Sequence, residues 1–295
     1  MIKLSSRTKI LVRKALEEDL GTGDITTDCL VPRNLRAEAS ITAKSGGLLC
    51  GGEVVREVFH SVDSSLAVKQ NVPDGKRISK GKVVFQIRGR ASSILKAERV
   101  ALNFLGPLSG IATLTHQFVQ KIKGTRSGIY DTRKTTPLWR ELEKYAVKTG
   151  GGKNHRFGLW DEILVKDNHW FAIWDLLEKT RCRYFGQKMK RALRREKVPV
   201  EVEVENLGQL IHFLEGDFLP GRILLDNFSV SELKRAVGLV RKRKLKISLE
   251  ASGGITLHNV RKVAQTGVER ISVGALTHSA PVLDFSLKLV RRFSS

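Results

Sequence analysis

The sequence predicts an α/β protein whose larger part is a small, irregular parallel β/α barrel. Two observations favour this fold class. From residue 128 onward, short apolar runs alternate six times with stretches of helical periodicity, as in parallel strands joined by helices. Charged, polar or glycine residues follow each of these runs. A barrel gathers such groups at the carboxyl ends of all its strands, whereas an open sheet uses mainly those beside its switch point.

The alternation predicts six strands and six helices. The expected strands are residues 128–130, 162–165, 200–204, 222–225, 246–250 and 270–273. The expected helices are residues 138–148, 169–193, 207–214, 230–242, 256–266 and 280–292.

The part of the chain before the barrel is expected to begin with a helix and continue with short strands. Residues 6–20 have an amphipathic pattern that two glycines end, and glycine turns then separate several short apolar runs. Beyond these strands, the helical period returns over residues 92–105, where Gly106 and Pro107 are expected to end the helix. A further helix is expected over residues 108–122.

Composition predicts a reduced, cytoplasmic protein. The 295 residues include 41% hydrophobic residues, enough for a sizeable core, and no apolar run of about eighteen residues suggests a membrane span. The first twenty residues lack the apolar core of a secretory signal. Three cysteines occur without metal-ligand spacing.

The net charge is +22, from 52 basic and 30 acidic residues, which raises the question of an anionic partner. Many of the cations fall in two segments, residues 181–197 and 241–246, each at the tail of a helical stretch. Cations at the end of a helix are favourable and remain solvated. We interpret both segments as solvated charge and consider nucleic acid an improbable partner, while a secondary contact with a polyanion stays open.

A second group of cations lies among glycines rather than at helical spacing. It follows two expected strands and the turn Gly150–Gly151–Gly152, and its members are Arg133, Lys134, Lys153, His155, Arg156 and Lys166. Cations at neighbouring strand ends meet at one edge of a sheet, where they can bind a small anion with several charges. The alternative interpretation is ordinary surface charge, and for His155 a paired core histidine.

Carboxylates gather on the next strands. Glu201, Glu203 and Glu205 alternate with valines and so share one face of a strand, and Asp226 ends the following strand. Carboxylates at neighbouring strand ends can hold a hydrated Mg²⁺ that meets substrate phosphates. Alternatively these acids balance the cations, which fits Glu201 and Glu205 better than Glu203.

Two glycine turns after the last strands suggest phosphate binding. Ser252–Gly253–Gly254 follows one expected strand, and Gly274 begins a similar turn that reaches His278. Backbone N–H groups at such turns, with a helix behind them, bind phosphate oxygens.

The motifs DTRKTTP, KYAVKTGGGKNHRFGL and LVKDNH closely resemble those of quinolinate phosphoribosyltransferases, and the likeness runs from EEDLGTGDITTD to SVGALTHSAPVLDFSLKLV. The resemblance implies an N-terminal α/β sandwich domain (1–108), on which the C-terminal tail (about 280–295) can pack, and a barrel domain (109–279). It also implies a reaction of quinolinate with phosphoribosyl pyrophosphate to give nicotinate mononucleotide, pyrophosphate and CO₂. A paralogous pyrophosphorylase-like protein with another substrate is the alternative.

The resemblance assigns roles to particular residues. Quinolinate would be bound by Arg99, Arg133, Lys134, His155, Arg156 and Lys166. The phosphoribosyl group and its phosphates would be bound by Glu203, Asp226, Ser252, Gly253, Gly254, Gly274 and His278. Lys134, Glu203 and Asp226 would be catalytic, and the two acids would hold Mg²⁺, directly or through water. Arg99 would act across a homodimer interface.

The chain departs from the family's pattern at three places. A glycine commonly follows Thr-Thr-Pro in the family, where this chain has Leu138. Trp160 and Trp170 are also unusual. We expect these residues to affect the rim of the site rather than its charged groups.

Overall fold

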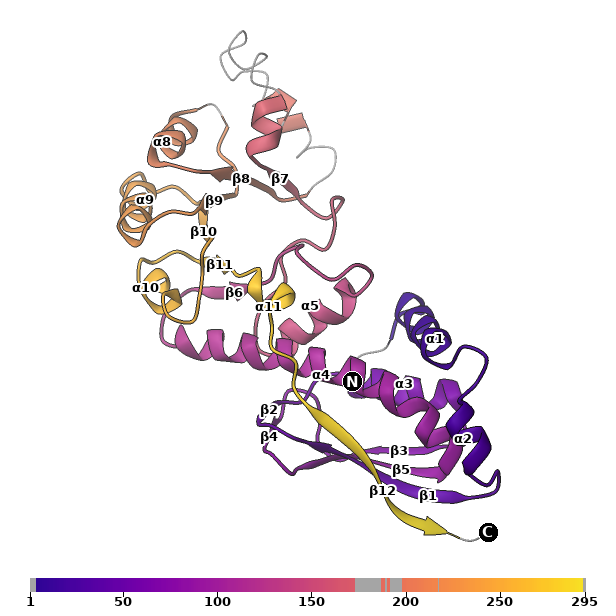
Figure 1. The fold of residues 1–295 in the computed structure, drawn as a ribbon. Helices are drawn as coiled ribbons and strands as arrows, with labels where there is room; N and C mark the ends of the chain where they lie inside the picture. Colours follow the sequence, from indigo (N-terminus) through magenta and orange to yellow (C-terminus); the bar gives the residue numbers. More distant parts are fainter. Residues whose placement is uncertain (1–3, 173–186, 189, 192–197, 217, 294–295) are drawn as a thin grey trace. The chain divides into compact units, whose positions relative to one another are not determined.

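The computed structural model describes residues 4–172, 187–188, 190–191, 198–216 and 218–293 (Figure 1). The chain forms two compact units. The first, here the sandwich unit, contains residues 1–116, 135–151 and 275–295. The second, here the barrel unit, contains residues 117–134 and 152–274. The boundaries expected at residues 108 and 279 stay predictions.

The sandwich unit contains a four-stranded antiparallel sheet in the order β12-β1-β5-β3. These strands are β1 (Arg36–Ala43), β3 (Ala67–Gln70), β5 (Val83–Arg90) and β12 (Phe285–Phe293), and β2 (Gly47–Leu48) pairs separately with β4 (Arg77–Ile78). Its helices are α1 (Ser6–Leu20), α2 (Ile25–Leu30), α3 (Gly52–Val62), α5 (Arg140–Thr149), α11 (Ala275–His278) and most of α4 (Ala91–Lys121). The predicted helix over residues 6–20 is confirmed, and the Ser5 side chain caps it by accepting a hydrogen bond from the Thr8 amide.

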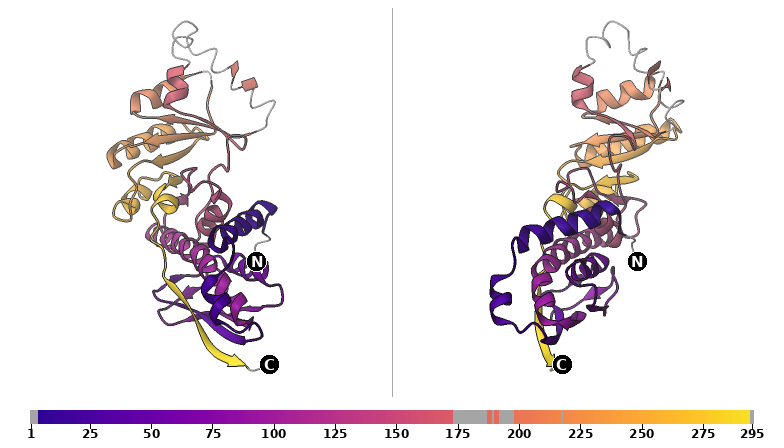
Figure 2. Two further views of the ribbon diagram at one scale, coloured as in Figure 1. Left: turned by 45° about the vertical axis from the view of Figure 1, so that its right-hand side comes forward. Right: turned by 90° about the vertical axis from the view of Figure 1, so that its right-hand side faces the viewer.

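The expected helix over residues 280–292 is wrong, because most of this segment is strand β12. It pairs antiparallel with β1 along its whole length, from Phe285 opposite Ala43 to Phe293 opposite Arg36. Phe285 and Leu287 are buried at a spacing of two residues, which is the period of a strand. Both views of Figure 2 show this strand (yellow) at the edge of the sheet. The backbone hydrogen bonds with β1 therefore stabilise the tail as a strand rather than a helix.

The expected break at Gly106–Pro107 is also wrong, because α4 continues through both residues. The backbone of the C-terminal tail lies against the helix here, and the Leu283 amide donates to the Gly106 carbonyl over 3.2 Å. A Cβ at Gly106 would lie 2.8 Å from the Leu283 carbonyl oxygen, and one at Gly110 would overlap that of Pro281. Gly106 and Gly110 allow the backbone of the tail to lie close to α4, and neither residue ends the helix.

The barrel unit is built on six parallel strands, which confirms the predicted fold class. They are β6 (Gly128–Tyr130), β7 (Ile163–Val165), β8 (Val200–Val204), β9 (Arg222–Asp226), β10 (Ser248–Ser252) and β11 (Arg270–Ser272). Their order is β6-β11-β10-β9-β8-β7, the cyclic order of a barrel opened between its first and second strands. On the open side, Lys153 forms a parallel bridge with Tyr130 of β6.

Helices α8 (Leu207–Glu215), α9 (Val230–Lys242) and α10 (Val260–Ala264) follow β8, β9 and β10. The expected helices 207–214 and 230–242 are confirmed, whereas α10 is shorter than the expected 256–266. Residues 167–172 are helical, but most of the expected helix 169–193, with most of the first basic segment, lies outside the described residues.

Among the described helices, none combines the length and apolarity that crossing a membrane requires.

Substitution of Gly110 tests the packing of the tail on α4. We expect Gly110→Ala to lower the free energy of unfolding by about 2 kcal/mol or more, because the new Cβ overlaps backbone that cannot rotate away. Gly238→Ala is the matched control, since Gly238 lies in helix α9 with nothing within 4 Å of an added Cβ. It should raise stability by roughly 0.5–1 kcal/mol. Urea unfolding of both variants gives the comparison, and equal effects would contradict the close approach.

Candidate active site

The carboxyl ends of the six parallel strands form one edge of the barrel unit, and polar residues gather there. Asp131 and Lys166 directly follow β6 and β7, and Asp226 and Ser252 end β9 and β10. In the parallel register Ser252 lies beside Asp226. The structure thus brings the cationic and acidic groups of the barrel unit to the same edge, as the strand alternation predicted.

A loop after the glycine turn is fixed to β6 by main-chain and side-chain hydrogen bonds. The Lys153 amide donates to the Ile129 carbonyl over 2.8 Å, and the Asp131 amide donates to the Lys153 carbonyl over 3.1 Å. The buried carboxylate of Asp131 accepts from the His155 amide over 2.8 Å. These contacts hold residues 153–156 against the first strand end.

Two guanidinium groups lie close enough together at this edge to repel. Arg156 is 8% exposed, and its Nη1 donates to the Glu162 carbonyl over 3.0 Å. Burial lowers the pKa of Arg156, and the charge of Arg133 lowers it further, while the carboxylates of Glu201 and Asp161 oppose both effects. A buried guanidinium at a strand end suits a carboxylate ligand, which an arginine binds through two parallel hydrogen bonds.

The His155 ring points into the barrel rather than to solvent. Its Nδ1 accepts from the Arg156 amide over 2.8 Å, while its Nε2 lies 3.0 Å from Glu201 Oε2 and 3.4 Å from Glu250 Oε1. Burial and the hydrogen bond accepted at Nδ1 both favour the neutral ring and so lower the pKa of His155. The two carboxylates favour the charged ring, outweigh burial, and raise the pKa of His155 overall. With a side chain only 6% exposed, His155 has the contacts of a paired core histidine, and its predicted contact with substrate stays a prediction.

Around His155 lies a set of buried and half-buried charges on or directly beside the strands, here called the charge belt. Its members are Glu162, Glu201, Arg222, Glu250 and Arg270. Arg222 contacts Glu162 and has its Nε 3.8 Å from Glu201, its partner in the strand register. Arg270 contacts Glu250, also its register partner, and its guanidinium lies 3.7 Å from the centre of the Tyr130 ring.

The sequence analysis missed the belt, although a signal was present. Arg222 and Arg270 each open a strand whose other residues are mostly buried, where an arginine requires a buried partner. Among the described residues, His155, Glu162 and Glu201 are spaced closely enough to hold a metal ion. Arg222 already contacts both carboxylates and supplies the positive charge, so we assign this group to ion pairing.

The predicted acidic pair lies on two neighbouring strands, β8 and β9. Glu203 on β8 contacts the Lys166 ammonium, and Asp226 at the end of β9 accepts from the Asn227 side chain over 2.8 Å. Burial raises the pKa of Glu203, and the charges of Asp226 and Asp167 raise it further while Lys166 opposes them. Mutually repelling carboxylate oxygens are a suitable donor set for Mg²⁺. Glu205 lies beyond the strand and is exposed.

The turn at Ser252–Gly253–Gly254 needs its glycines. Gly253 and Gly254 have φ of 84° and 60°, and a Cβ at Gly253 would overlap the Asn227 side chain. The expected helix directly behind this turn does not form, because α10 begins only at Val260. The Asn259 side chain instead accepts from the Thr256 amide and donates to the Gly254 carbonyl, each over 2.8 Å. Any phosphate site here depends on the turn itself, not on a helix terminus.

Two predicted site residues belong to the sandwich unit. Arg99 is exposed on α4, and His278 is exposed at the end of α11 with its Nδ1 2.6 Å from the Ser279 hydroxyl.

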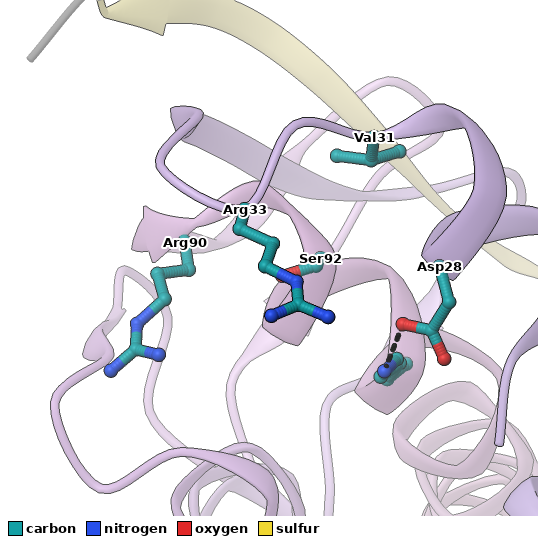
Figure 3. A pocket seen from close by; sticks show the side chains of 6 residues that line it. Asp28, Val31, Arg33, Arg90 and Ser92 are labelled. Carbon is teal, nitrogen blue, oxygen red and sulfur yellow. Dashed lines mark hydrogen bonds and ion pairs between the residues drawn. The ribbon is translucent and has the colours of Figure 1, made fainter.

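The sandwich unit also contains a cavity of about 440 Å³, whose lining is shown in Figure 3. It is lined by Asp28, Val31, Arg33, Arg90, Ser92 and Lys96, and Lys96 pairs with Asp28 at 2.6 Å. None of the predicted site residues lines it.

Comparison with protein families decides the relationship. Residues 24–109 match the model of the quinolinate phosphoribosyl transferase N-terminal domain, and residues 111–288 match that of the C-terminal domain. The chain belongs to the quinolinate phosphoribosyl transferase family.

Curated relatives of this family are similar over nearly the whole chain. The nicotinate-nucleotide pyrophosphorylase [carboxylating] of Mycobacterium leprae is 41% identical over 281 residues, which are 94% of this chain and 95% of the relative. The quinolinate phosphoribosyltransferase [decarboxylating] 1b of Nicotiana tabacum is 38% identical over 297 residues, which cover 95% of this chain and 82% of the relative. The crystal structure of NadC from Streptococcus pyogenes superimposes with a TM-score of 0.88 at 35% identity, and the match covers 100% of both chains.

The residue after Thr-Thr-Pro, where the resemblance leads us to expect glycine, has a structural cost in this chain. It is Leu138, which adopts a φ of 68°. A side chain in this left-handed region costs roughly 1–2 kcal/mol. Leu138 is also 87% exposed, so it gains little from burial in return. The Phe104 and Trp139 rings stack with centroids 4.8 Å apart, which holds the residue after Leu138 on helix α4.

We therefore expect Leu138→Gly to stabilise the protein. The relief of backbone strain should exceed the entropy that glycine loses on folding, for a net gain of about 0.5–1 kcal/mol. Leu138→Ala is the control, because it removes the exposed side chain and keeps the strain. Thermal unfolding of the three proteins measures the difference. If alanine stabilises as much as glycine, the side chain and not the backbone is the cause.

Proposed function

We propose that the chain transfers the phosphoribosyl group of phosphoribosyl pyrophosphate to quinolinate and decarboxylates the product. The products are nicotinate mononucleotide, pyrophosphate and CO₂, a step of NAD biosynthesis. Family membership over most of the chain supports this activity, as do relatives named as carboxylating pyrophosphorylases. The structural observation that carries the proposal is the buried guanidinium of Arg156, which the Glu162 carbonyl holds in a loop fixed to the end of β6.

Quinolinate carries two carboxylates on adjacent ring carbons and therefore needs several donors close together. In this proposal Arg133 and Arg156 bind one or both carboxylates, Lys134 and Lys166 complete the set of donors, and His155 supports Arg156 through the hydrogen bond from its amide. A second copy of the chain supplies Arg99, so the working form is a homodimer. Fixing two anionic substrates side by side overcomes their repulsion and supplies much of the rate enhancement.

The reaction balances without an organic cofactor or a nucleophilic side chain. The pyridine nitrogen attacks the anomeric carbon, a C–N bond forms, and the bond from that carbon to the pyrophosphate oxygen breaks. The ring nitrogen is then cationic, and its positive charge stabilises the electron pair that stays on the adjacent ring carbon when the carboxylate leaves as CO₂. A proton replaces the lost carboxylate. Lys134 and Lys166 would stabilise the negative charge that develops on the departing pyrophosphate.

Glu203 and Asp226 would hold Mg²⁺, directly or through water, and the bound ion would neutralise phosphate charge. The backbone turns at Ser252–Gly254 and Gly274, together with His278, would bind the phosphates. We place the enzyme in the cytoplasm. A paralogous protein acting on another substrate remains the rival, and the relatives' names favour quinolinate over it.

The activity is tested by incubating the protein with phosphoribosyl pyrophosphate, Mg²⁺ and either quinolinate or nicotinic acid. We expect nicotinate mononucleotide and CO₂ from quinolinate and at least about a hundredfold less product from nicotinic acid. With one carboxylate missing, buried cations lose a partner at a cost of roughly 2–5 kcal/mol. Product analysis by chromatography and CO₂ release measures both. Comparable turnover of nicotinic acid would overturn the assignment.

The contribution of Arg99 across an interface is tested by complementation. Arg99→Ala and Lys134→Ala should each abolish most of the activity alone. In a heterodimer of the two variants, one site combines both lesions, and the other receives Lys134 from one chain and Arg99 from its partner. Co-expression with two tags and tandem purification should therefore restore activity to about half that of wild type.

A heterodimer as inactive as either parent would show that Arg99 acts within its own subunit or away from the site. Co-expression of wild type under the same two tags is the control for the purification.

A further inference from the structure

Glu201 is a fully buried carboxylate, 0% exposed, in the middle of the barrel unit. The sequence suggested only that it balances charge. In the structure it lies two residues before Glu203 on β8, on the same face of the strand, but below the strand ends where substrate would be bound. Its Oε2 is 3.0 Å from Nε2 of His155. Glu201 therefore reaches the site through His155.

The tautomer of His155 shows what this contact does. Nδ1 accepts the hydrogen bond of the Arg156 amide, so in the neutral ring the proton is carried by Nε2. Nε2 lies 3.0 Å from Glu201 Oε2 and 3.4 Å from Glu250 Oε1. The carboxylates thus stabilise the tautomer of His155 that is protonated at Nε2. In this tautomer and ring orientation, Nδ1 can accept the hydrogen bond of the Arg156 amide. Histidines in metal and catalytic sites are commonly fixed by a carboxylate in this way.

A second connection runs from the charge belt to the guanidinium of Arg156. The Nη1 atom of Arg156 donates to the backbone carbonyl of Glu162. The carboxylate of Glu162 contacts Arg222, and the Nε atom of Arg222 lies 3.8 Å from Glu201. Arg156 is thus held from below at its backbone through His155 and at its side chain through Glu162. The first of these supports involves Glu201 directly, through its contact with His155.

We propose that Glu201 is a positioning residue for quinolinate binding, which acts through His155 to place Arg156 against a substrate carboxylate. This inference rests on the proposed function. Glu201 itself does not touch the substrate. Its removal should weaken quinolinate binding while leaving the affinity for phosphoribosyl pyrophosphate, which the proposal assigns to Glu203 and Asp226, much less affected.

The test uses Glu201→Gln, which keeps the shape and one acceptor oxygen but removes the charge. We expect the KM and the Kd for quinolinate to rise about tenfold or more, as for a binding group displaced by a fraction of an ångström. The KM for phosphoribosyl pyrophosphate should change less than about threefold. Glu215→Gln is the matched control, because it removes the carboxylate of an exposed Glu215–Arg243 pair on the same unit. It should leave both constants unchanged.

A double-substitution cycle separates positioning from general damage. If Glu201 acts through His155, Glu201→Gln should add little to the rise in quinolinate Kd caused by His155→Asn, because the connection is already cut. Histidine ¹⁵N shifts give a readout independent of catalysis, with the His155 signals assigned by their loss in His155→Asn. In wild type Nδ1 should be unprotonated and Nε2 protonated, and Glu201→Gln should shift both signals toward a mixture of tautomers.

Three results overturn the inference. They are a quinolinate Kd unchanged by Glu201→Gln, equal rises in the constants of both substrates, and full additivity with His155→Asn. If Glu201→Gln fails to fold, Glu201→Asp replaces it, with the same expected split between substrates. A wild-type protein that turns over another acid in place of quinolinate overturns the proposed function instead. In that event the ¹⁵N shifts still decide whether Glu201 sets the tautomer of His155.

Discussion

The contact of His155 with the buried carboxylates of Glu201 and Glu250 is the interaction on which the site depends. It joins the interior of the barrel unit to the loop that presents Arg156. Apolar residues alone would fill a barrel of this size, and ion pairs are an expensive substitute. In the belt, Glu201 and Glu250 each have a cationic partner in the register of the neighbouring strand. Strand register and the geometry of the site are therefore coupled.

The strand order also separates the charges that two anionic substrates require. Lys166 follows β7, and the carboxylates of Glu203 and Asp226 belong to the next strands, β8 and β9, so this edge carries charges of both signs. Lys166, after β7, contacts Glu203 of β8 and marks the boundary between them. Such a division suits one substrate bound by its carboxylates and another bound through a metal ion and phosphates. The parallel fold thus provides both sides without any specialised insertion.

Local patterns in the sequence predicted those features that depend on neighbouring residues. The α9 helix has both its period and its Ser229 capping box in the sequence, and its predicted bounds are confirmed. The features that failed depend on distant segments. The tail became β12 because β1 offered an open edge, and α4 continues through Pro107 because the same tail lies against Gly106 and Gly110. Periodicity within the tail could not reveal partners more than 170 residues away.

The same limit explains why Glu201 was interpreted only as a counterweight. An alternating Val-Glu pattern shows which face the carboxylates share, but it cannot say that one meets His155 and the other Lys166. The structure also supplies an argument about why the belt is charged. Replacing buried ion pairs by apolar residues of similar size is often neutral or stabilising by about 1–4 kcal/mol. A barrel that needed only stability could therefore use leucine and valine at these positions. Charges that fix a histidine tautomer beneath a binding loop give an orientation that apolar packing cannot supply.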